Sequence, residues 1–185
     1  MIRNPEQADE VRRVGAEPVV VDLEHASEDD VAQAIAGSDA VVFAAAAGPG
    51  SGPQRKETMD YGGAVKPIAA AKQAGVNRYV IVSSMGANPE ARGEDTFSVY
   101  LRAKGRADEA VRSSGLAATV VRPGGLTNDP GTGRVSLGES VRRGQVSRDD
   151  VAAVLAAVLD SPNTIGKTVD LIGGNTPVAE AVAAI

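Results

Sequence analysis

The stretch Tyr79-Val80-Ile81-Val82-Ser83-Ser84 and, one loop later, Tyr100-Leu101-Arg102-Ala103-Lys104 decide what fold and chemistry to expect. The run of β-branched residues predicts a buried strand. On a helix, a tyrosine and a lysine four residues apart lie on one face, one turn apart. A nearby cation favours the phenolate, so such a pair can exchange a proton near neutral pH. A half-buried tyrosine beside a solvated lysine would show the same spacing.

Further motifs follow in order along the chain. A second apolar run, residues 118–122, ends in Pro123-Gly124-Gly125-Leu126. Residues 39–48, 73–80, 147–152 and 170–174 add an alanine-rich strand end, a strand entry, a helix start and a closing strand. In this order the motifs resemble the atypical, NmrA-like NAD(P)H-binding branch of the short-chain dehydrogenase/reductase superfamily.

The resemblance implies one α/β domain over residues 1–185, with a Rossmann-like, doubly wound parallel sheet and helices on both faces. It implies hydride transfer involving a small carbonyl, quinone or flavin-like acceptor. Ser83 or Ser84 would orient the acceptor oxygen, Tyr100 would donate the proton, and Lys104 would hold the ribose and lower the pKa of Tyr100. The implied cofactor contacts are Asp22, Leu23, Ala44, Ala45, Ala46, Gly48, Ser83, Tyr100, Lys104, Pro123, Gly124, Gly125 and Leu126.

Arg3 carries the signal for cofactor choice. An arginine at the end of a second Rossmann strand can contact a 2′-phosphate, whereas an acidic residue there would bind the ribose hydroxyl. The sequence therefore predicts NADP(H) in preference to NAD(H). The alternatives are that Arg3 is a frayed terminal residue without contacts, and that Asp22 is a turn residue instead of an adenine neighbour.

The family begins with a strand and a glycine-rich turn that bind the pyrophosphate, and residues 1–20 contain neither. We therefore expect an N-terminally truncated sheet and weak NADP(H) binding. In the doubly wound strand order, the missing strands would lie between residues 18–23 and 40–47. Either these two segments pair directly, or the exposed edges recruit another copy of the chain.

Alternating patterns predict strands at residues 18–23, 40–47, 78–84, 118–122 and 167–172, and helices near 6–15, 28–37, 56–75, 97–115 and 148–160. Ser27 with Asp30 and Ser147 with Asp150 have capping-box spacing. Pro67 predicts a kink in its helix, and Gly105 a local weakness.

Composition excludes several classes of function. The 185 residues carry a net charge of −5, three Tyr, two Phe and no Trp, which disfavours nucleic-acid binding. No apolar run approaches the roughly 20 residues that span a bilayer. With no Cys and His25 alone, the usual metal sites cannot form. We expect a cytoplasmic protein whose partner is a small-molecule substrate.

The glycine-rich loop at residues 48–53 does not have the spacing of a phosphate-binding turn, and its prolines lack N–H donors. We expect it to lie beside the nicotinamide ribose. Two alternatives to an enzyme stay open: a non-enzymatic NADP(H)-binding redox sensor or regulator, and an inactive fragment. The identity of the substrate does not follow from these residues.

Overall fold

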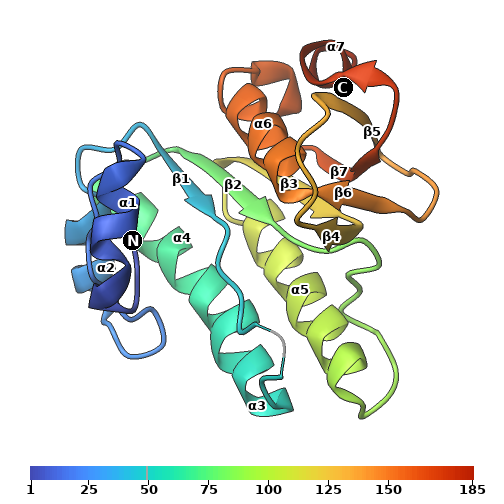
Figure 1. Cartoon of the computed structure of the whole chain (residues 1–185). Helices are drawn as coiled ribbons and strands as arrows, with labels where there is room; N and C mark the ends of the chain where they lie inside the picture. Colours follow the sequence, from blue (N-terminus) through green and yellow to red (C-terminus); the bar gives the residue numbers. More distant parts are fainter. Residues whose placement is uncertain (49) are drawn as a thin grey trace.

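The computed structural model describes residues 1–48 and 50–185, and a six-stranded sheet runs through its centre (Figure 1). The strand order is β1-β2-β3-β7-β5-β8. The strands are β1 (Ala40–Phe43), β2 (Arg78–Val82), β3 (Ala117–Pro123), β7 (Thr168–Gly173), β5 (Arg134–Gly138) and β8 (Thr176–Pro177). The first four are parallel, and β5 runs antiparallel to both β7 and β8. Beside this sheet, β4 (Gly125–Thr127) pairs with β6 (Gln145–Ser147).

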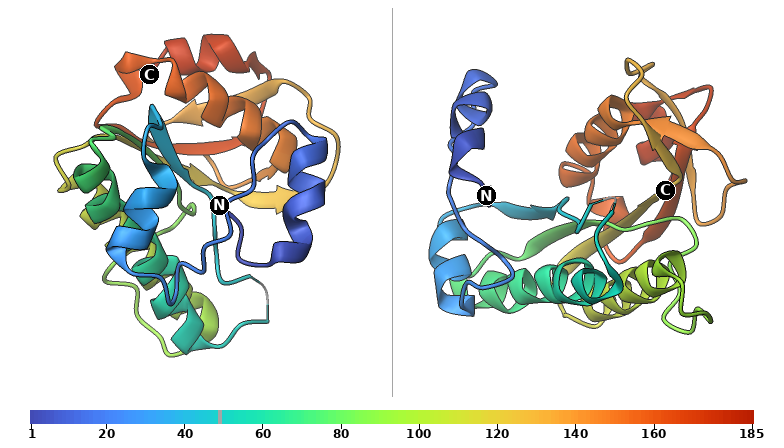
Figure 2. Two further views of the ribbon diagram at one scale, coloured as in Figure 1. Left: turned by 90° about the vertical axis from the view of Figure 1, so that its left-hand side faces the viewer. Right: turned by 60° about the horizontal axis from the view of Figure 1, so that its bottom comes forward.

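Helices cover both faces of the sheet (Figure 2). The helical segments are η1 (Pro5–Gln7), α1 (Ala8–Arg13), α2 (Glu28–Ile35), α3 (Pro53–Arg55), the π-helix η2 (Lys56–Gly62), α4 (Gly63–Ala74), α5 (Thr96–Arg112), α6 (Arg148–Leu159), η3 (Pro162–Thr164) and α7 (Val178–Ala183). Helices α4 and α5 lie on one face and α6 on the other. The parallel strands and two helical layers confirm the predicted α/β Rossmann-like fold.

Strand β2 shows how the sequence divides the core between the two faces. Tyr79 and Ile81 pack into the cluster that includes residues of α2, α4 and α5, whereas Val80 packs into the cluster formed with α6 and α7. All three side chains are fully buried. Burying a side chain of this size stabilises the fold by roughly 1.5–3 kcal/mol, so both helical layers are held by this strand.

The predicted strand at residues 18–23 is wrong. Only Val20 forms a bridge, a parallel one with Ile2, whose N–H donates to Val19 at 2.9 Å and whose carbonyl accepts from Val21. The predicted direct pairing of this segment with residues 40–47 is also wrong, because β1 is an edge strand that pairs with β2. A strand needs a neighbour along its length, and residues 18–23 have one for a single position.

Other sequence predictions are confirmed in substance and corrected at their ends. The strand predicted at 40–47 stops at Phe43, and the helix predicted at 56–75 is a π-helix followed by α4. Pro67 lies inside α4. Strands β4, β6 and β8 have only two or three residues and were not predicted, and β5 and helix α7 were not predicted either. Ser27 and Asp30 form the expected capping box.

Gly105 has a packing role that the sequence did not reveal. It lies in α5 where the backbone of Asn88 and Pro89 approaches the helix so closely that a Cβ atom would collide with it. The glycine therefore fixes the loop after β2 against α5, close to the tyrosine and lysine predicted as catalytic.

Within residues 1–48 and 50–185, none of the helices is long and apolar enough to cross a membrane. Over the same residues, no group of three or more His, Cys, Asp or Glu side chains is arranged to hold a metal ion.

Candidate functional site

Helix α5 carries Tyr100 and Lys104 toward the carboxyl end of β2. Its start is fixed by Asp95, whose carboxylate accepts hydrogen bonds from the N–H groups of Phe97 at 3.1 Å and Ser98 at 3.0 Å. An N-cap of this kind contributes about 1 kcal/mol. The predicted helix therefore forms, and Tyr100 and Lys104 lie one turn apart on it.

Lys104 is buried, with an exposed fraction of 2%. Its ammonium group donates to the carbonyl oxygen of Val82 at 3.0 Å and lies 3.7 Å from Oδ1 of Asp60. It also lies 5.7 Å from the centre of the Phe43 ring. Burial lowers the pKa of Lys104, and the neighbouring carboxylate of Asp60 opposes that shift. The lysine is thus held inside the fold by β2 and by one carboxylate.

The predicted lowering of the pKa of Tyr100 is wrong for this arrangement, because its pKa is raised. Burial raises the pKa of Tyr100 above 10.0, and the hydroxyl of Ser84 offsets the rise only in part. The carboxylates of Asp60 and Asp108 raise it further. The charge of Lys104 does not reverse this rise, because its ammonium group is engaged by Val82 and Asp60. Tyr100 consequently keeps its proton at neutral pH.

Lys56 and Asp60, both on the π-helix η2, belong to the same cluster, and sequence reasoning missed them. The ammonium group of Lys56 lies 5.5 Å from the centre of the Tyr100 ring and donates to the carbonyl of Gly48 at 2.9 Å. Oδ2 of Asp60 lies 4.0 Å from that ammonium group and accepts from the N–H of Ala47 at 3.4 Å. Asp60 is fully buried, and burial raises its pKa.

π-Helical turns are rare and occur often at functional sites. Here η2 turns Lys56 and Asp60 toward Lys104 and toward the loop after β1. No sequence motif marks such a turn, although two opposite charges four residues apart, at positions 56 and 60, could have drawn attention.

The two serines that end β2 have different surroundings. Ser84 lines a cavity together with Pro123, Gly124 and Gly125, whereas Ser83 is 5% exposed, does not line that cavity and lies near Asp108. Asp108 forms an ion pair with Arg122, at 2.7 Å from Oδ2 to Nη2. Of the pair that the sequence left open, Ser84 is therefore the serine that a small molecule can reach.

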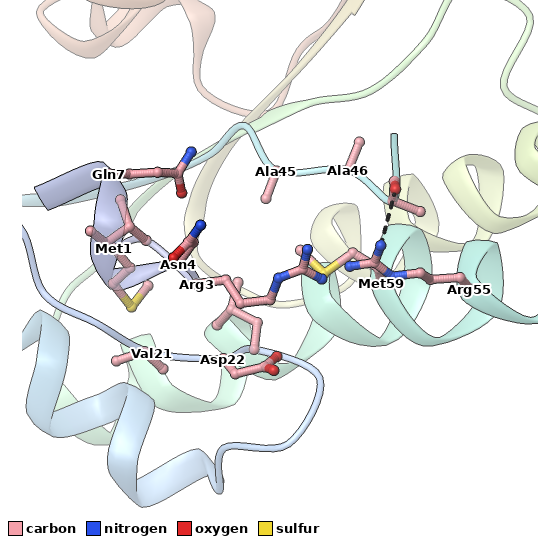
Figure 3. A pocket seen from close by; sticks show the side chains of 13 residues that line it. Met1, Arg3, Asn4, Gln7, Val21, Asp22, Ala45, Ala46, Arg55 and Met59 are labelled. Atoms are coloured by element: carbon pink, nitrogen blue, oxygen red, sulfur yellow. Dashed lines mark hydrogen bonds between the residues drawn. The ribbon is translucent and has the colours of Figure 1, made fainter. Parts of the chain in front are cut away.

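The cofactor residues predicted near the N-terminus surround a separate cleft of about 520 Å³ (Figure 3). Of the predicted set, Arg3, Asp22, Leu23, Ala45 and Ala46 line it. Ala47, Arg55 and Met59 line it as well and were not predicted as contacts. This cleft separates the N-terminal segment from the loop after β1.

Arg3 is not a frayed residue without contacts. One of its guanidinium nitrogens lies 3.5 Å from Oε2 of Glu24, and Arg55 donates to the same oxygen at 3.1 and 3.0 Å. The hydroxyl of Thr58 binds the other oxygen of Glu24 at 2.7 Å. Figure 3 shows Arg3 and Arg55 reaching toward each other across the cleft. Two guanidinium groups share the carboxylate of Glu24, and Asp22 adds a second carboxylate to the lining of the cleft.

Asp22 makes the contacts of a turn residue. Its carboxylate accepts from the N–H of Glu24 at 3.0 Å and lies 3.0 Å from Nδ1 of His25. The hydrogen bond with His25 lowers the pKa of Asp22. The side chain still lines the N-terminal cleft, so its turn geometry and its predicted place beside a ligand are compatible.

The remaining predicted cofactor residues lie elsewhere. Pro123, Gly124 and Gly125 line the cavity of Ser84, whereas Leu126 lies outside both cavities and is 44% exposed. Ala44 and Gly48 also lie outside both linings, although the carbonyl of Gly48 holds Lys56. Most of the predicted cofactor residues therefore line one of two separate cavities, the N-terminal cleft or the cavity beside Ser84.

Comparison with known proteins identifies the family. The model of the NAD(P)H-binding family matches residues 1–162. The chain belongs to this NAD(P)H-binding family. A Bacillus subtilis relative, described as the uncharacterized sugar epimerase YhfK, is 41% identical over 182 residues, which cover 98% of this chain and 85% of the relative.

Solved structures agree with the family. A Bacillus halodurans protein, described as a candidate NAD-dependent epimerase/dehydratase, is 40% identical with a TM-score of 0.91 over 100% of this chain and 86% of its own. The oxidoreductase ylbE from Lactococcus lactis is 26% identical with a TM-score of 0.79, over 92% of this chain and 77% of its own.

The donors at the two cavities have chemistry that suits a nicotinamide dinucleotide and its acceptor. Arg3 and Arg55 offer cationic donors to a phosphate of the adenosine half, and Ser84, Gly124 and Gly125 line the other cavity, where an acceptor would meet the reacting half. The pyrophosphate has no glycine-rich turn within residues 1–185. The chemistry of the residues present therefore suits the two ends of the dinucleotide.

Proposed function

We propose that this NAD(P)H-binding protein is an NADP(H)-dependent oxidoreductase that reduces a small carbonyl, quinone or flavin-like acceptor. Family membership accounts for the binding of NAD(P)H. The direction of the reaction and the choice of NADP(H) are inferred from the charges at the two ends of the site.

The observation that carries the proposal is a protonated tyrosine beside a reachable serine. Burial holds the pKa of Tyr100 above 10.0, and the nearby hydroxyl of Ser84 offsets part of that rise. A phenol that keeps its proton at neutral pH is suited to donate it to an oxygen that gains electrons, which is the requirement of a reduction. Ser84 would orient that oxygen, and the bound cofactor would supply the hydride.

Lys104 acts on Tyr100 indirectly in this proposal. Its ammonium group is anchored by Val82 and faces Asp60, so it balances the carboxylate that would otherwise raise the pKa of Tyr100 further. After Tyr100 has given up its proton, Lys104 and Lys56 supply the positive charge that stabilises the phenolate. The carbonyl contact to Val82 keeps Lys104 in place through both states.

The preference for NADP(H) is supported by Arg3 and Arg55. The two guanidinium groups flank Glu24 and place cationic donors at the N-terminal cleft, which the carboxylate of Asp22 also lines. A 2′-phosphate would compete with Glu24 for these donors, and charge-assisted hydrogen bonds are stronger than neutral ones. Glu24 would by itself disfavour a phosphate, so the preference depends on both arginines.

The test follows NADPH oxidation with a panel of carbonyl, quinone and flavin acceptors. Tyr100→Phe should lower turnover by ~10²-fold, because general acid assistance has that size, while NADPH affinity changes little. The matched control is Tyr61→Phe, which removes a hydroxyl from a ring that stacks on Arg106 outside the cluster. That control should keep its turnover.

Other results would redirect the proposal. NADPH binding without turnover on any acceptor would favour a redox sensor or regulator. Isomerisation of a substrate without net consumption of NADPH would favour an epimerase, the activity named for the Bacillus subtilis relative. Full activity of Tyr100→Phe would exclude Tyr100 as the proton donor.

A further inference from the structure

The cavity beside Ser84 has walls of a defined chemical kind. It measures about 270 Å³ and lies between the carboxyl ends of β2 and β3, the start of α5, and the turn before β6. Its side walls include the apolar side chains of Met85, Phe97 and Leu101, and its remaining polar side chains are Ser84 and Arg143. It adjoins Tyr100 through Phe97, since the two rings stack with centres 6.1 Å apart.

Phe97 offers a free aromatic surface at this cavity. It is 63% exposed although it is a large apolar side chain, and its ring lies at 29° to that of Tyr100. An apolar ligand that covers this ring would remove apolar surface from water. A flat apolar molecule stacked on the free face of Phe97 would lie in the cavity that Ser84 lines.

Arg143 is the charged side chain that lines this cavity. Within residues 1–48 and 50–185, it makes no hydrogen bond or ion pair in the structure. Nearby arginines are engaged: Arg102 donates to the carbonyls of Ala91 and Gly93, and Arg122 is paired with Asp108. Arg143 is thus a cation at the cavity wall that is free to meet a ligand.

The backbone that carries Arg143 is held firmly. The N–H of Gly125 donates to the carbonyl of Gly144 at 3.0 Å, and a Cβ atom on Gly124 would collide with that same carbonyl. A Cβ atom on Gly144 would come within 3.0 Å of Ile172. Arg143 therefore follows the tightly packed strand ends, and its distance from Ser84 is set by the fold.

We infer that the acceptor is a flat apolar molecule bearing an anionic group, with its ring on Phe97 and its carboxylate or phosphate on Arg143. This inference rests on the proposed reductase function, because it treats the Ser84 cavity as the acceptor site. The whole chain carries a charge of −5, so an anionic ligand requires such a local cation.

The experiment measures equilibrium binding in matched pairs of probes, without NADPH. The phosphate arm compares FMN with riboflavin, which share a ring system and differ in the phosphate. The carboxylate arm compares 2-naphthoate with 2-naphthylmethanol. In at least one arm the anionic probe should bind about tenfold more tightly than its neutral partner, the effect of one charge-assisted contact. The arm that shows the preference identifies the anionic group.

Variants locate the contact. Arg143→Gln should remove the anionic preference, and Arg142→Gln, a change of the neighbouring exposed arginine outside the cavity lining, should keep it. Phe97→Ala should weaken both members of a pair equally, by about tenfold. The readout is binding, so absent reductase activity would refute the proposed function and leave this measurement intact.

Two results would overturn the inference. In one, neither anionic probe binds more tightly than its neutral partner. In the other, the preference survives Arg143→Gln and disappears in Arg3→Gln, which would place the anion in the N-terminal cleft.

Discussion

The N-terminal cleft and the cluster around α5 hold their charges in opposite ways. Residues 1–30 contain no buried side chain, and Arg3 is 55% exposed where it meets Glu24. Around α5, Lys104, Asp60 and Asp108 are each at most 2% exposed. Charges in water interact weakly and stay free for a ligand, whereas buried charges bind one another strongly and support the fold.

The exposed charges of the N-terminal cleft are therefore expected to affect ligand binding, and the buried charges around α5 to affect stability. Substitutions in the N-terminal cleft should change the affinity for ligands and leave the free energy of unfolding almost unchanged. Substitutions in the buried cluster should change the free energy of unfolding as well as the chemistry.

Lys104→Met should lower the free energy of unfolding by about 3–5 kcal/mol, because it leaves the carboxylate of Asp60 buried without its nearest cation. Urea denaturation at neutral pH measures the change. The control is Lys72→Met, the same substitution at an exposed position of α4, which should change stability by less than about 0.5 kcal/mol.

The double variant Lys104→Met with Asp60→Asn sharpens this result. Removing both charges eliminates the buried unpaired carboxylate, so part of the lost stability should return. A double variant that is as unstable as the sum of the two single variants would show that the pair does not interact. The buried cluster would then be a matter of packing alone.

The sequence predicts contacts between residues that are close along the chain better than contacts between distant residues, and the buried cluster contains both kinds. Tyr100 and Lys104 are one turn apart, so their helix and shared face follow from local spacing. Asp60 reaches Lys104 through the tertiary fold and a π-helical turn, and neither leaves a periodic signal. For this reason the direction of the pKa shift of Tyr100 was predicted wrongly.

A similar limit applies to the sheet. Strands β2 and β3 were predicted because their β-branched runs are continuous, and they pair with neighbours on both sides. Residues 18–23 have the same composition but pair at Val20 alone. Strand formation depends on a partner strand, and a sequence pattern in one segment does not contain that information.

Asp150 is a buried charge outside both the N-terminal cleft and the cluster around α5. It is 3% exposed and accepts from the N–H groups of Thr132 and Gly133, at 2.9 and 2.7 Å. Although burial acts to raise it, the hydrogen bonds from Thr132, Gly133 and Ser147 hold the pKa of Asp150 below 3.8. Asp150→Asn should lower the free energy of unfolding by about 1–3 kcal/mol at neutral pH.

The pH dependence of this difference has a definite sign. A folded pKa below the unfolded one contributes stability that is present above 3.8 and is lost as pH falls through the folded value. Thermal melts of the two proteins should therefore converge as the pH is lowered below 3.8. A difference that stays constant with pH would show that the hydrogen bonds do not depend on the charge of Asp150.

Arg3→Gln removes an exposed charge, and its effect should appear in the affinity for NADPH. We expect NADPH binding to weaken by about fivefold, or roughly 1 kcal/mol, because Arg55 remains beside Glu24 and Arg3 is largely in water. NADH affinity should stay the same. Calorimetric titration measures both. Equal losses for the two cofactors would mean that Arg3 does not contact the 2′-phosphate.

Asp22→Asn should have the smallest effect, a change of no more than about 0.5 kcal/mol in the free energy of unfolding. Its carboxylate meets His25 and the N–H of Glu24, but its side chain is 38% exposed, so solvent screens both contacts. The hydrogen bond with His25 lowers its pKa, so what stability it adds is present above 3.8 and fades below it. Asparagine can still accept from the N–H of Glu24 and keep the turn. Denaturation of this variant at neutral pH should therefore match the wild type, and a loss near that of Asp150→Asn would show that the N-terminal cleft is as firmly held as the buried cluster.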